Sequence, residues 1–139
     1  MINVVLMAGS GKRFTDAGYN KSKPLIPVSG EPMIVQATKS YPKADKWVFV
    51  VRQEHLEEKE VIDTLKTVAD DVKVIVDQNP IGQLNSCLVA KDFYLDEAPM
   101  FVGACDLGME YDKNKFKEMM DSSDAPDMVS FSFTRQPSL

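Results

Sequence analysis

The chain has 139 residues, of which 44% are hydrophobic and 27% charged. A chain of this size and composition forms an ordinary globular core, which excludes fibrous and disordered classes and indicates one domain over residues 1–139. Its 16 basic and 21 acidic residues give a net charge of −5, which argues against nucleic acid or an anionic membrane as the main partner. Small anionic substrates are not excluded, because local charge decides their binding.

The cysteines and the start of the chain indicate the compartment. Cys87 and Cys105 are the two cysteines; they do not form a CxxC pair and make no disulfide framework. Residues 1–7 are apolar but lack a basic leader and a long hydrophobic run, so we expect neither a signal peptide nor a transmembrane segment. These features favour a reduced, cytoplasmic setting.

The apolar pattern predicts strands that alternate with helices. In chain order we predict a strand over 2–7, a loop rich in glycine, serine and lysine over 8–23, a helix over 32–41, a strand over 47–51, a helix over 54–69, a strand over 72–76, a helix over 84–93, a strand over 100–104, a helix over 114–120 and a strand over 127–133. Pro32 suits the first turn of a helix. Leu56, Val61 and Leu65 fall near helical spacing, with charges between them.

This order of elements predicts an α/β fold with a mostly parallel sheet and helices on both faces. In such folds, ligands bind at the carboxyl ends of the strands. The loops at that edge are residues 8–23, 52–54, 77–83 and 104–112. We therefore expect the residues that carry chemistry in these four loops.

The first loop begins Ala-Gly-Ser-Gly-Lys-Arg at residues 8–13. Gly9 and Gly11 allow a tight turn and a close approach of the backbone to a ligand, and exposed N–H groups in such a turn cradle anions. Four cations lie within twelve residues of this loop: Lys12, Arg13, Lys21 and Lys23. In an acidic protein, this local field suits a polyphosphate.

Two familiar glycine motifs do not fit this loop. A P-loop needs a glycine where Leu6 stands, and a serine or threonine where Arg13 stands. The dinucleotide fingerprint needs a small residue where Phe14 stands. On the loop alone, a glycine turn with a solvated basic flank is an equal alternative to a phosphate site.

The next segment favours the phosphate site. Residues 23–28 read Lys-Pro-Leu-Ile-Pro-Val, and residues 30–34 read Gly-Glu-Pro-Met-Ile. Together with the glycine loop they resemble the sugar-nucleotidyltransferase family, whose signature is a GxGxR loop followed by K-P-L-I/L-P-V and G-x-P-M/L-I/L. Every one of these positions is matched within residues 1–34.

The resemblance implies a Rossmann-like three-layer α/β sandwich, which we expect to be incomplete at the C-terminus because family enzymes continue well past this length. It implies that a nucleoside triphosphate is joined to a sugar 1-phosphate, with release of pyrophosphate and with Mg²⁺ as the cofactor. The phosphate-contacting catalytic residues would be Arg13 and Lys23. The nucleotide would be held by a run of five neighbouring residues: Ala8, Gly9, Ser10, Gly11 and Lys12.

The family also places functional residues in two later loops. In residues 77–83, Gln78 would read the nucleobase with a donor and an acceptor, and Gly82 would let the backbone approach the ring; an ordinary strand-to-helix turn is the alternative. Asp106, just after the strand over 100–104, would bind the metal, since Mg²⁺ prefers oxygen ligands. A capping aspartate is the alternative there. Asp112 is either a second ligand or, as we expect, the cap of the helix near residue 114.

Two further residues are expected to have no role in binding or catalysis, and the sequence leaves more than one function open. We expect His55 to be surface or structural rather than catalytic, and Cys87 to lie in the core. The partners implied are a nucleoside triphosphate and a phosphorylated small molecule, with no nucleic acid and no membrane, while the nucleobase and the oligomeric state are not predicted. The family's sugar pocket, acidic-lysine motif and second metal-binding aspartate have no counterpart in this sequence. The alternatives are therefore a non-catalytic or truncated nucleotide-binding module, or a cytidylyltransferase acting on an alditol or choline phosphate.

Overall fold

The computed structural model describes residues 1–94 and 98–132. The chain divides into two compact units, Met1–Met109 and Glu110–Leu139, and each is described here by itself. No helix among the described residues is long and apolar enough to cross a membrane.

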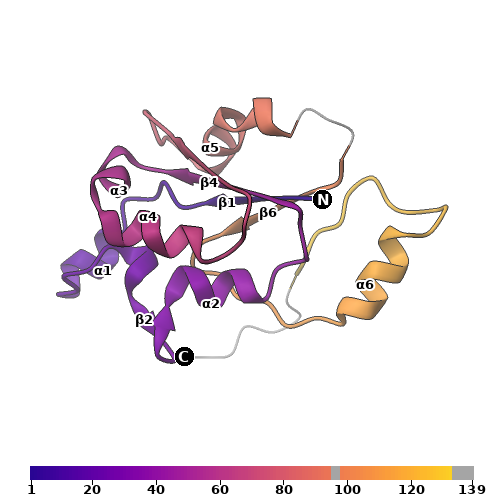
Figure 1. Cartoon of the computed structure of the whole chain (residues 1–139), viewed down its shortest axis with the longest axis horizontal. Coiled ribbons are helices and arrows are strands. Elements are labelled where there is room, and N and C mark those ends of the chain that lie inside the picture. The colour runs from indigo at the N-terminus through magenta and orange to yellow at the C-terminus, as the bar shows by residue number, and fades with distance from the viewer. Residues whose placement is uncertain (95–97, 133–139) are drawn as a thin grey trace. The chain divides into compact units, whose positions relative to one another are not determined.

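The first unit is built on a four-stranded sheet in the order β5-β4-β1-β6, in which every neighbouring pair is parallel (Figure 1). Its strands are β1 (Ile2–Leu6), β4 (Lys46–Val51), β5 (Val72–Val76) and β6 (Met100–Ala104). The first three are rich in valine and isoleucine, whose branched side chains pack well on a pleated surface. The register pairs Leu6 with Val50 on one side and with Ala104 on the other. The carboxyl ends of these strands therefore meet at one edge of the sheet.

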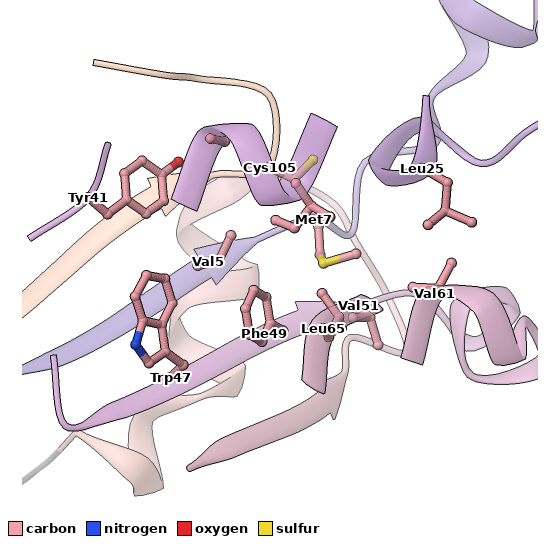
Figure 2. Close-up of a cluster of buried hydrophobic side chains, with 12 residues drawn as sticks. Val5, Met7, Leu25, Tyr41, Trp47, Phe49, Val51, Val61, Leu65 and Cys105 are labelled. Atoms are coloured by element: carbon pink, nitrogen blue, oxygen red, sulfur yellow. The ribbon is translucent and has the colours of Figure 1, made fainter. Parts of the chain in front are cut away.

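One face of the sheet is covered by α2 (Met33–Lys39) and α4 (Lys59–Lys66). Figure 2 shows the buried cluster between sheet and helices, in which Val5 and Phe49 from the strands lie near Leu65 of α4. All three side chains are fully buried, and burying each contributes about 1.5–3 kcal/mol. The helical spacing of Val61 and Leu65 places both on this apolar side of α4.

The opposite face carries a smaller cluster. It packs Val4 and Val50 of the sheet against Ala90, which lies between α5 (Gln83–Val89) and the short 3₁₀ helix η2 (Lys91–Phe93). Figure 1 shows α5 on the side of the sheet away from α2 and α4. The predicted α/β arrangement of a parallel sheet between two helical layers is confirmed.

Two predicted helices and one predicted strand differ from the structure by more than the exact position of their ends. The helix expected over 54–69 is two helices, α3 (Gln53–Glu57) and α4, because Glu58 has an extended backbone and its carboxylate accepts a hydrogen bond from the Ser22 hydroxyl. The helix expected over 84–93 ends at Val89 as α5. The Cys87 carbonyl accepts hydrogen bonds from the Tyr94 hydroxyl and from the Ala90 N–H. It is therefore not available to accept a hydrogen bond from a further turn of α-helix.

The third difference concerns the predicted strand over 127–133, which is wrong over its described residues, 127–132; residue 133 lies outside them. Met128 is 84% exposed and Val129 is 37% exposed. The alternation of apolar residues there does not correspond to a buried face, so the pattern alone misled the prediction. Cys87, expected in the core, is only half-buried.

The stretch expected as a loop over 8–23, and the residues just after it, contain regular structure. They form α1 (Lys12–Asp16), the 3₁₀ helix η1 (Lys23–Leu25) and a small antiparallel pair, β2 (Pro27–Val28) with β3 (Glu31–Pro32). These elements are too short for hydrophobic periodicity to reveal them.

In the second unit, α6 (Lys113–Met120) begins at Asp112. The Asp112 carboxylate accepts hydrogen bonds from the backbone N–H groups of Asn114 and Lys115, both at 3.0 Å. This confirms Asp112 as the helix cap, since such a cap satisfies N–H groups that the helix leaves unpaired. The rings of Tyr111, Phe116 and Phe131 pack against one another in this unit.

Candidate functional site

A cavity of about 250 Å³ opens where β1 and β6 end, and we call it the central cavity. All its lining residues belong to the first unit: Leu6, Met7, Ala8, Gly9, Lys23, Pro24, Pro80, Gly82, Gln83, Ser86, Ala104, Cys105 and Asp106. Five of them are site residues expected from the sequence: Ala8, Gly9, Lys23, Gly82 and Asp106. The parallel sheet thus brings three separate loops to one place, as its topology requires.

Two residues that line this cavity, Lys23 and Asp106, form an ion pair with each other. The Lys23 Nζ lies 2.5 Å from the Asp106 Oδ2, and the two side chains are 22% and 40% exposed. The same Nζ lies 5.6 Å from the centre of the Phe14 ring, within range of a cation–π interaction. Lys23 is therefore held between an aromatic face and a carboxylate.

The glycine turn explains how Lys23 approaches the end of β1. Gly11 has a φ of +63°, in the left-handed region that side chains other than glycine avoid. A Cβ placed on Gly11 would lie 3.3 Å from the Cβ of Lys23. Pro24 and Leu25, which follow Lys23, are buried. The lysine stem is thus fixed from both sides, while its ammonium group faces the cavity.

A second cavity, of about 370 Å³, lies beside the glycine loop and shares Gly9 and Lys23 with the central cavity. Ser10 and Gly11 line it, together with Phe14 and residues 19–22. Two of the residues that line it, Lys21 and Ser22, contact α4 and the residue before it. Lys21 forms a 2.9 Å ion pair with Glu60 of α4, and the Ser22 hydroxyl donates to Glu58.

The loop after β5 is ordered by a buried carboxylate that the sequence analysis missed. Asp77 is 3% exposed. Its Oδ1 accepts from the Asn79 N–H at 3.0 Å and its Oδ2 accepts from the Ser86 hydroxyl at 2.7 Å. The sequence signal was an aspartate directly after a strand and two residues before Asn79, a typical start of an Asx turn. This arrangement presents Gly82 and Ser86 to the central cavity.

The end of β6 is fixed by Tyr41, which the sequence analysis also missed. The Tyr41 hydroxyl donates to the Ala104 carbonyl, and a Cβ on Gly103 would lie 2.6 Å from the Tyr41 ring. Burial raises the pKa of Tyr41 well above its usual value, so its hydroxyl stays a donor. Tyr41 thus holds the strand end that leads directly to Asp106.

Cys105, beside Asp106, is not a candidate nucleophile. It is 4% exposed, and burial raises the pKa of its thiol to about 11, although Lys23 opposes the shift. At neutral pH the group is therefore a protonated thiol, and the thiolate is the reactive form.

Other expected site residues lie outside the lining of the central cavity. Lys12 and Arg13 are exposed on α1, and Gln78 is exposed directly after Asp77. His55 is 7% exposed, and its Nδ1 accepts from the Arg52 N–H at 3.3 Å. Burial lowers the pKa of His55, with Glu58 opposing the shift, so the neutral ring acts as a cap of α3. The structural role expected for His55 agrees with this placement.

The described residues contain no group of three or more His, Cys, Asp or Glu side chains that could hold a metal ion by themselves. Asp106 offers one half-exposed carboxylate at the cavity. Mg²⁺ commonly binds through one or two carboxylates and completes its shell with water and substrate phosphates. The single carboxylate of Asp106 therefore fits a Mg²⁺ ion that takes its other ligands from water and substrate, although it does not fit a cage made by the protein alone.

Comparisons with known proteins agree with this architecture. The family model described as "MobA-like NTP transferase domain" matches residues 3–130. No curated protein matches the chain. Among solved structures, a putative glucose-1-phosphate thymidylyltransferase from Bacillus anthracis, determined in complex with a sucrose, is similar with a TM-score of 0.69 and 18% identity, over 88% of this chain and 52% of that one.

Two further structures have the same fold. HddC from Yersinia pseudotuberculosis is similar with a TM-score of 0.64 and 24% identity, over 89% of this chain and 56% of that one. The inositol-1-phosphate CTP transferase from T. maritima has a TM-score of 0.60 and 16% identity, over 76% of this chain and 43% of that one. The matched region is thus about half the length of each of the three solved proteins.

Proposed function

The chain belongs to the MobA-like NTP transferase domain family, and on this premise we propose that it forms the triphosphate-binding domain of a nucleotidyltransferase. The domain covers residues 1–139 and acts on a nucleoside triphosphate and a sugar 1-phosphate, with release of pyrophosphate. The observation that carries the proposal is the common position of Gly9, Lys23 and Asp106 on the central cavity. A glycine turn, a cation and a carboxylate are the groups that a metal–triphosphate complex needs.

The reaction joins two anions, and this explains the charges of the site. An oxygen of the acceptor phosphate attacks the α-phosphorus, and the bond from that phosphorus to the leaving pyrophosphate breaks. Cations must offset the repulsion between the phosphates and stabilise charge in the transition state. Lys23 is proposed to serve this purpose at the cavity, and the exposed Arg13 and Lys12 of α1 to contact the part of the triphosphate that lies outside it.

The glycine loop holds the nucleotide by its backbone. Ala8 and Gly9 line the central cavity, whereas Ser10 and Gly11 line the second one. Because both cavities share Gly9 and Lys23, a triphosphate can extend from one to the other past the lysine. Apart from each glycine and its two chain neighbours, no heavy atom of the described residues lies within 4 Å of a Cβ built on Gly9 or on Gly82, which leaves room for a ligand at both glycines.

Gln78 and Gly82 are proposed to read the nucleobase. Gly82 lines the central cavity together with Gln83. Gln78 is exposed in the same turn, and its amide can both donate and accept hydrogen bonds. Support is stronger for Gly82, which lies at the cavity, than for Gln78.

Asp106 is proposed as the Mg²⁺ ligand. When bound there with the triphosphate, Mg²⁺ would offset phosphate charge during transfer. The residues of this chain supply one carboxylate for it, and phosphate oxygens and water complete the shell. Activity is therefore expected to require added Mg²⁺ and to disappear in excess EDTA, measured as pyrophosphate release.

A second candidate differs in the acceptor. The T. maritima structure with the same fold is an inositol-1-phosphate CTP transferase, which favours cytidylyl transfer to a phosphate that is not a sugar phosphate as the nearest alternative. A nucleotide-binding module without catalysis is the third candidate.

One assay separates these candidates. The purified 139-residue chain is incubated with Mg²⁺, with each of ATP, CTP, GTP, UTP and dTTP, and with glucose 1-phosphate, mannose 1-phosphate, inositol 1-phosphate or choline phosphate. Pyrophosphate release is measured for each pair, and binding of each triphosphate is measured in parallel. Release that depends on a sugar 1-phosphate supports the proposal, and release only with inositol or choline phosphate favours the second candidate. Saturable nucleotide binding without release on any pair supports the binding module. No triphosphate binding at all overturns the assignment of the site.

A further inference from the structure

The ion pair between Lys23 and Asp106 is not explained by the separate role proposed for each residue. One side chain is proposed to bind phosphate and the other to bind metal, yet here they bind each other, with Nζ and Oδ2 2.5 Å apart. The residues are 83 positions apart in the chain, so the fold and not the local sequence creates the contact. The ammonium group thus lies beside the carboxylate oxygen that a divalent cation would use.

The surroundings let the ammonium group move while the lysine stem stays fixed. The Lys23 Cβ packs beside Gly11, Pro24 is buried, and the Phe14 ring lies 5.6 Å from Nζ. Lysine ends in a compact charge on a flexible stem. The charged end can therefore exchange Asp106 for another anion in the same cavity without a change in the backbone.

We propose that the Lys23–Asp106 ion pair is a resting contact that blocks the metal position until a triphosphate arrives, so that Mg²⁺ and nucleotide bind cooperatively. The inference rests on the proposed function of the site. A metal ion that arrives alone must displace Lys23 and then lie next to its positive charge. A metal that arrives with a triphosphate gives the Lys23 ammonium group a phosphate in exchange for the carboxylate.

This exchange couples the two ligands in both directions. If a triphosphate raises the affinity for the metal, the metal raises the affinity for the triphosphate by the same factor. The lysine thereby keeps the carboxylate from holding a metal ion in the absence of substrate. Removal of the lysine charge should therefore raise the affinity for the metal ion alone. It should also weaken the cooperativity between the metal ion and the triphosphate.

The test measures Mn²⁺ binding without nucleotide, by the loss of the free-ion signal in electron paramagnetic resonance. Lys23→Met keeps the length of the stem and removes the charge. We expect it to bind Mn²⁺ about fivefold more tightly than the natural chain, the factor that corresponds to the upper range of a partly exposed ion pair. Asp106→Asn, introduced into the Lys23→Met chain, should remove the added binding.

A charge-matched control separates the contact from the general field. Lys21→Met removes the same charge two residues away, but Lys21 pairs with Glu60 and not with Asp106. It should change Mn²⁺ affinity by less than about twofold, because exposed charges farther away are screened. An equal gain in Lys21→Met and Lys23→Met would overturn the proposal, and so would no gain in Lys23→Met. Circular dichroism checks folding, and Lys23→Gln replaces Lys23→Met if that variant does not fold.

The second stage repeats the titration with each of ATP, CTP, GTP, UTP and dTTP. In the natural chain, the triphosphate that binds should tighten Mn²⁺ binding, and in Lys23→Met this gain should shrink. If no triphosphate binds the natural chain, the proposed function fails. If a triphosphate binds but the Mn²⁺ affinities without nucleotide are equal in the two proteins, only the resting contact fails.

Discussion

The residues that line the central cavity fall into two groups by their place in the sequence. We call these groups the first wall and the far wall, and they are built in different ways. The first wall comes from the first 24 residues of the chain and carries Lys23; it consists of residues 6–9 with Lys23 and Pro24. The far wall is collected from two distant loops and carries Asp106; it consists of residues that line the cavity within 80–86 and 104–106. The first wall owes its shape to local glycine and proline chemistry, whereas the far wall depends on the packing of side chains such as Tyr41 and Asp77.

This difference predicts which substitutions should affect activity and which should affect the stability of the fold. Changes in the first wall should remove activity with little effect on folding, since its charged groups are partly exposed. Changes in the supports of the far wall should act first on stability, because those supports are buried. Four substitutions examine this division, from the largest expected effect to the smallest.

Lys23→Ala should give the largest loss. We expect turnover to fall roughly 100-fold or more, the scale of losing one group that stabilises charge in a transition state. Pyrophosphate release under saturating nucleotide measures the effect. Lys46→Ala is the control, since Lys46 is exposed and lies at the start of β4, away from the carboxyl ends of the strands. Near-full activity of Lys23→Ala would remove Lys23 from the mechanism.

Arg13→Ala should also lower turnover by roughly 100-fold. Arg13 is exposed on α1 and does not line the central cavity, so this variant tests whether the first wall extends beyond the cavity when substrates are bound. Initial rates over a range of nucleotide concentrations separate turnover from KM. A rate equal to that of the natural chain would confine the first wall to the residues that line the cavity.

Gly103→Ala should destabilise the far wall. The added Cβ would lie 2.6 Å from the Tyr41 ring, and overpacking of this kind costs about 1–3 kcal/mol. Urea denaturation followed by circular dichroism measures the free energy of unfolding. In Gly108→Ala the added Cβ meets no atom within 4 Å, so its stability should stay within about 0.5 kcal/mol of the natural chain. Equal stability of the two variants would contradict tight packing at Tyr41.

Phe14→Leu should have the smallest effect. The Phe14 ring supports the Lys23 ammonium group at 5.6 Å, and an interaction of this kind contributes about 0.5–1 kcal/mol at an exposed site. We expect a rise of roughly two- to fivefold in KM for the nucleotide, with the same stability. Phe14→Tyr keeps the aromatic face and should retain the natural KM. An equal KM in all three proteins would show that Phe14 does not position the lysine.

Much of the fold could be predicted because its signals are local. The apolar runs of β5 and β6 were found with their observed bounds, and β1 and β4 within one residue. The helix breaks at Glu58 and after Val89 were missed because each depends on a hydrogen bond from another segment, from Ser22 and from Tyr94. The strand expected over 127–133 failed for the opposite reason: its pattern was local, but its described residues have no paired strand.

The residues of the candidate site also divide into those with a local sequence signal and those without one. Gly9 and Lys23 were predicted as site residues from the glycine turn, the nearby cations and the resemblance to the sugar-nucleotidyltransferase family. Asp106 was predicted from its place after an apolar strand, where that family has a metal-binding aspartate. These signals did not indicate Tyr41 or Asp77, because neither belongs to a motif and each acts through a contact with a distant residue. The roles of all these residues in catalysis stay predictions until the variants are measured.

The sequence by itself determined the alternation of the four sheet strands with helices, the parallel sheet and the glycine–lysine segment of the first wall, because periodicity, turn chemistry and close spacing are properties of neighbouring residues. Only the tertiary structure decided that Lys23 meets Asp106, that Tyr41 closes over Gly103 and that residues from three loops line one cavity. These contacts join residues from different strands and loops, and their distances follow from how the sheet and its helices pack.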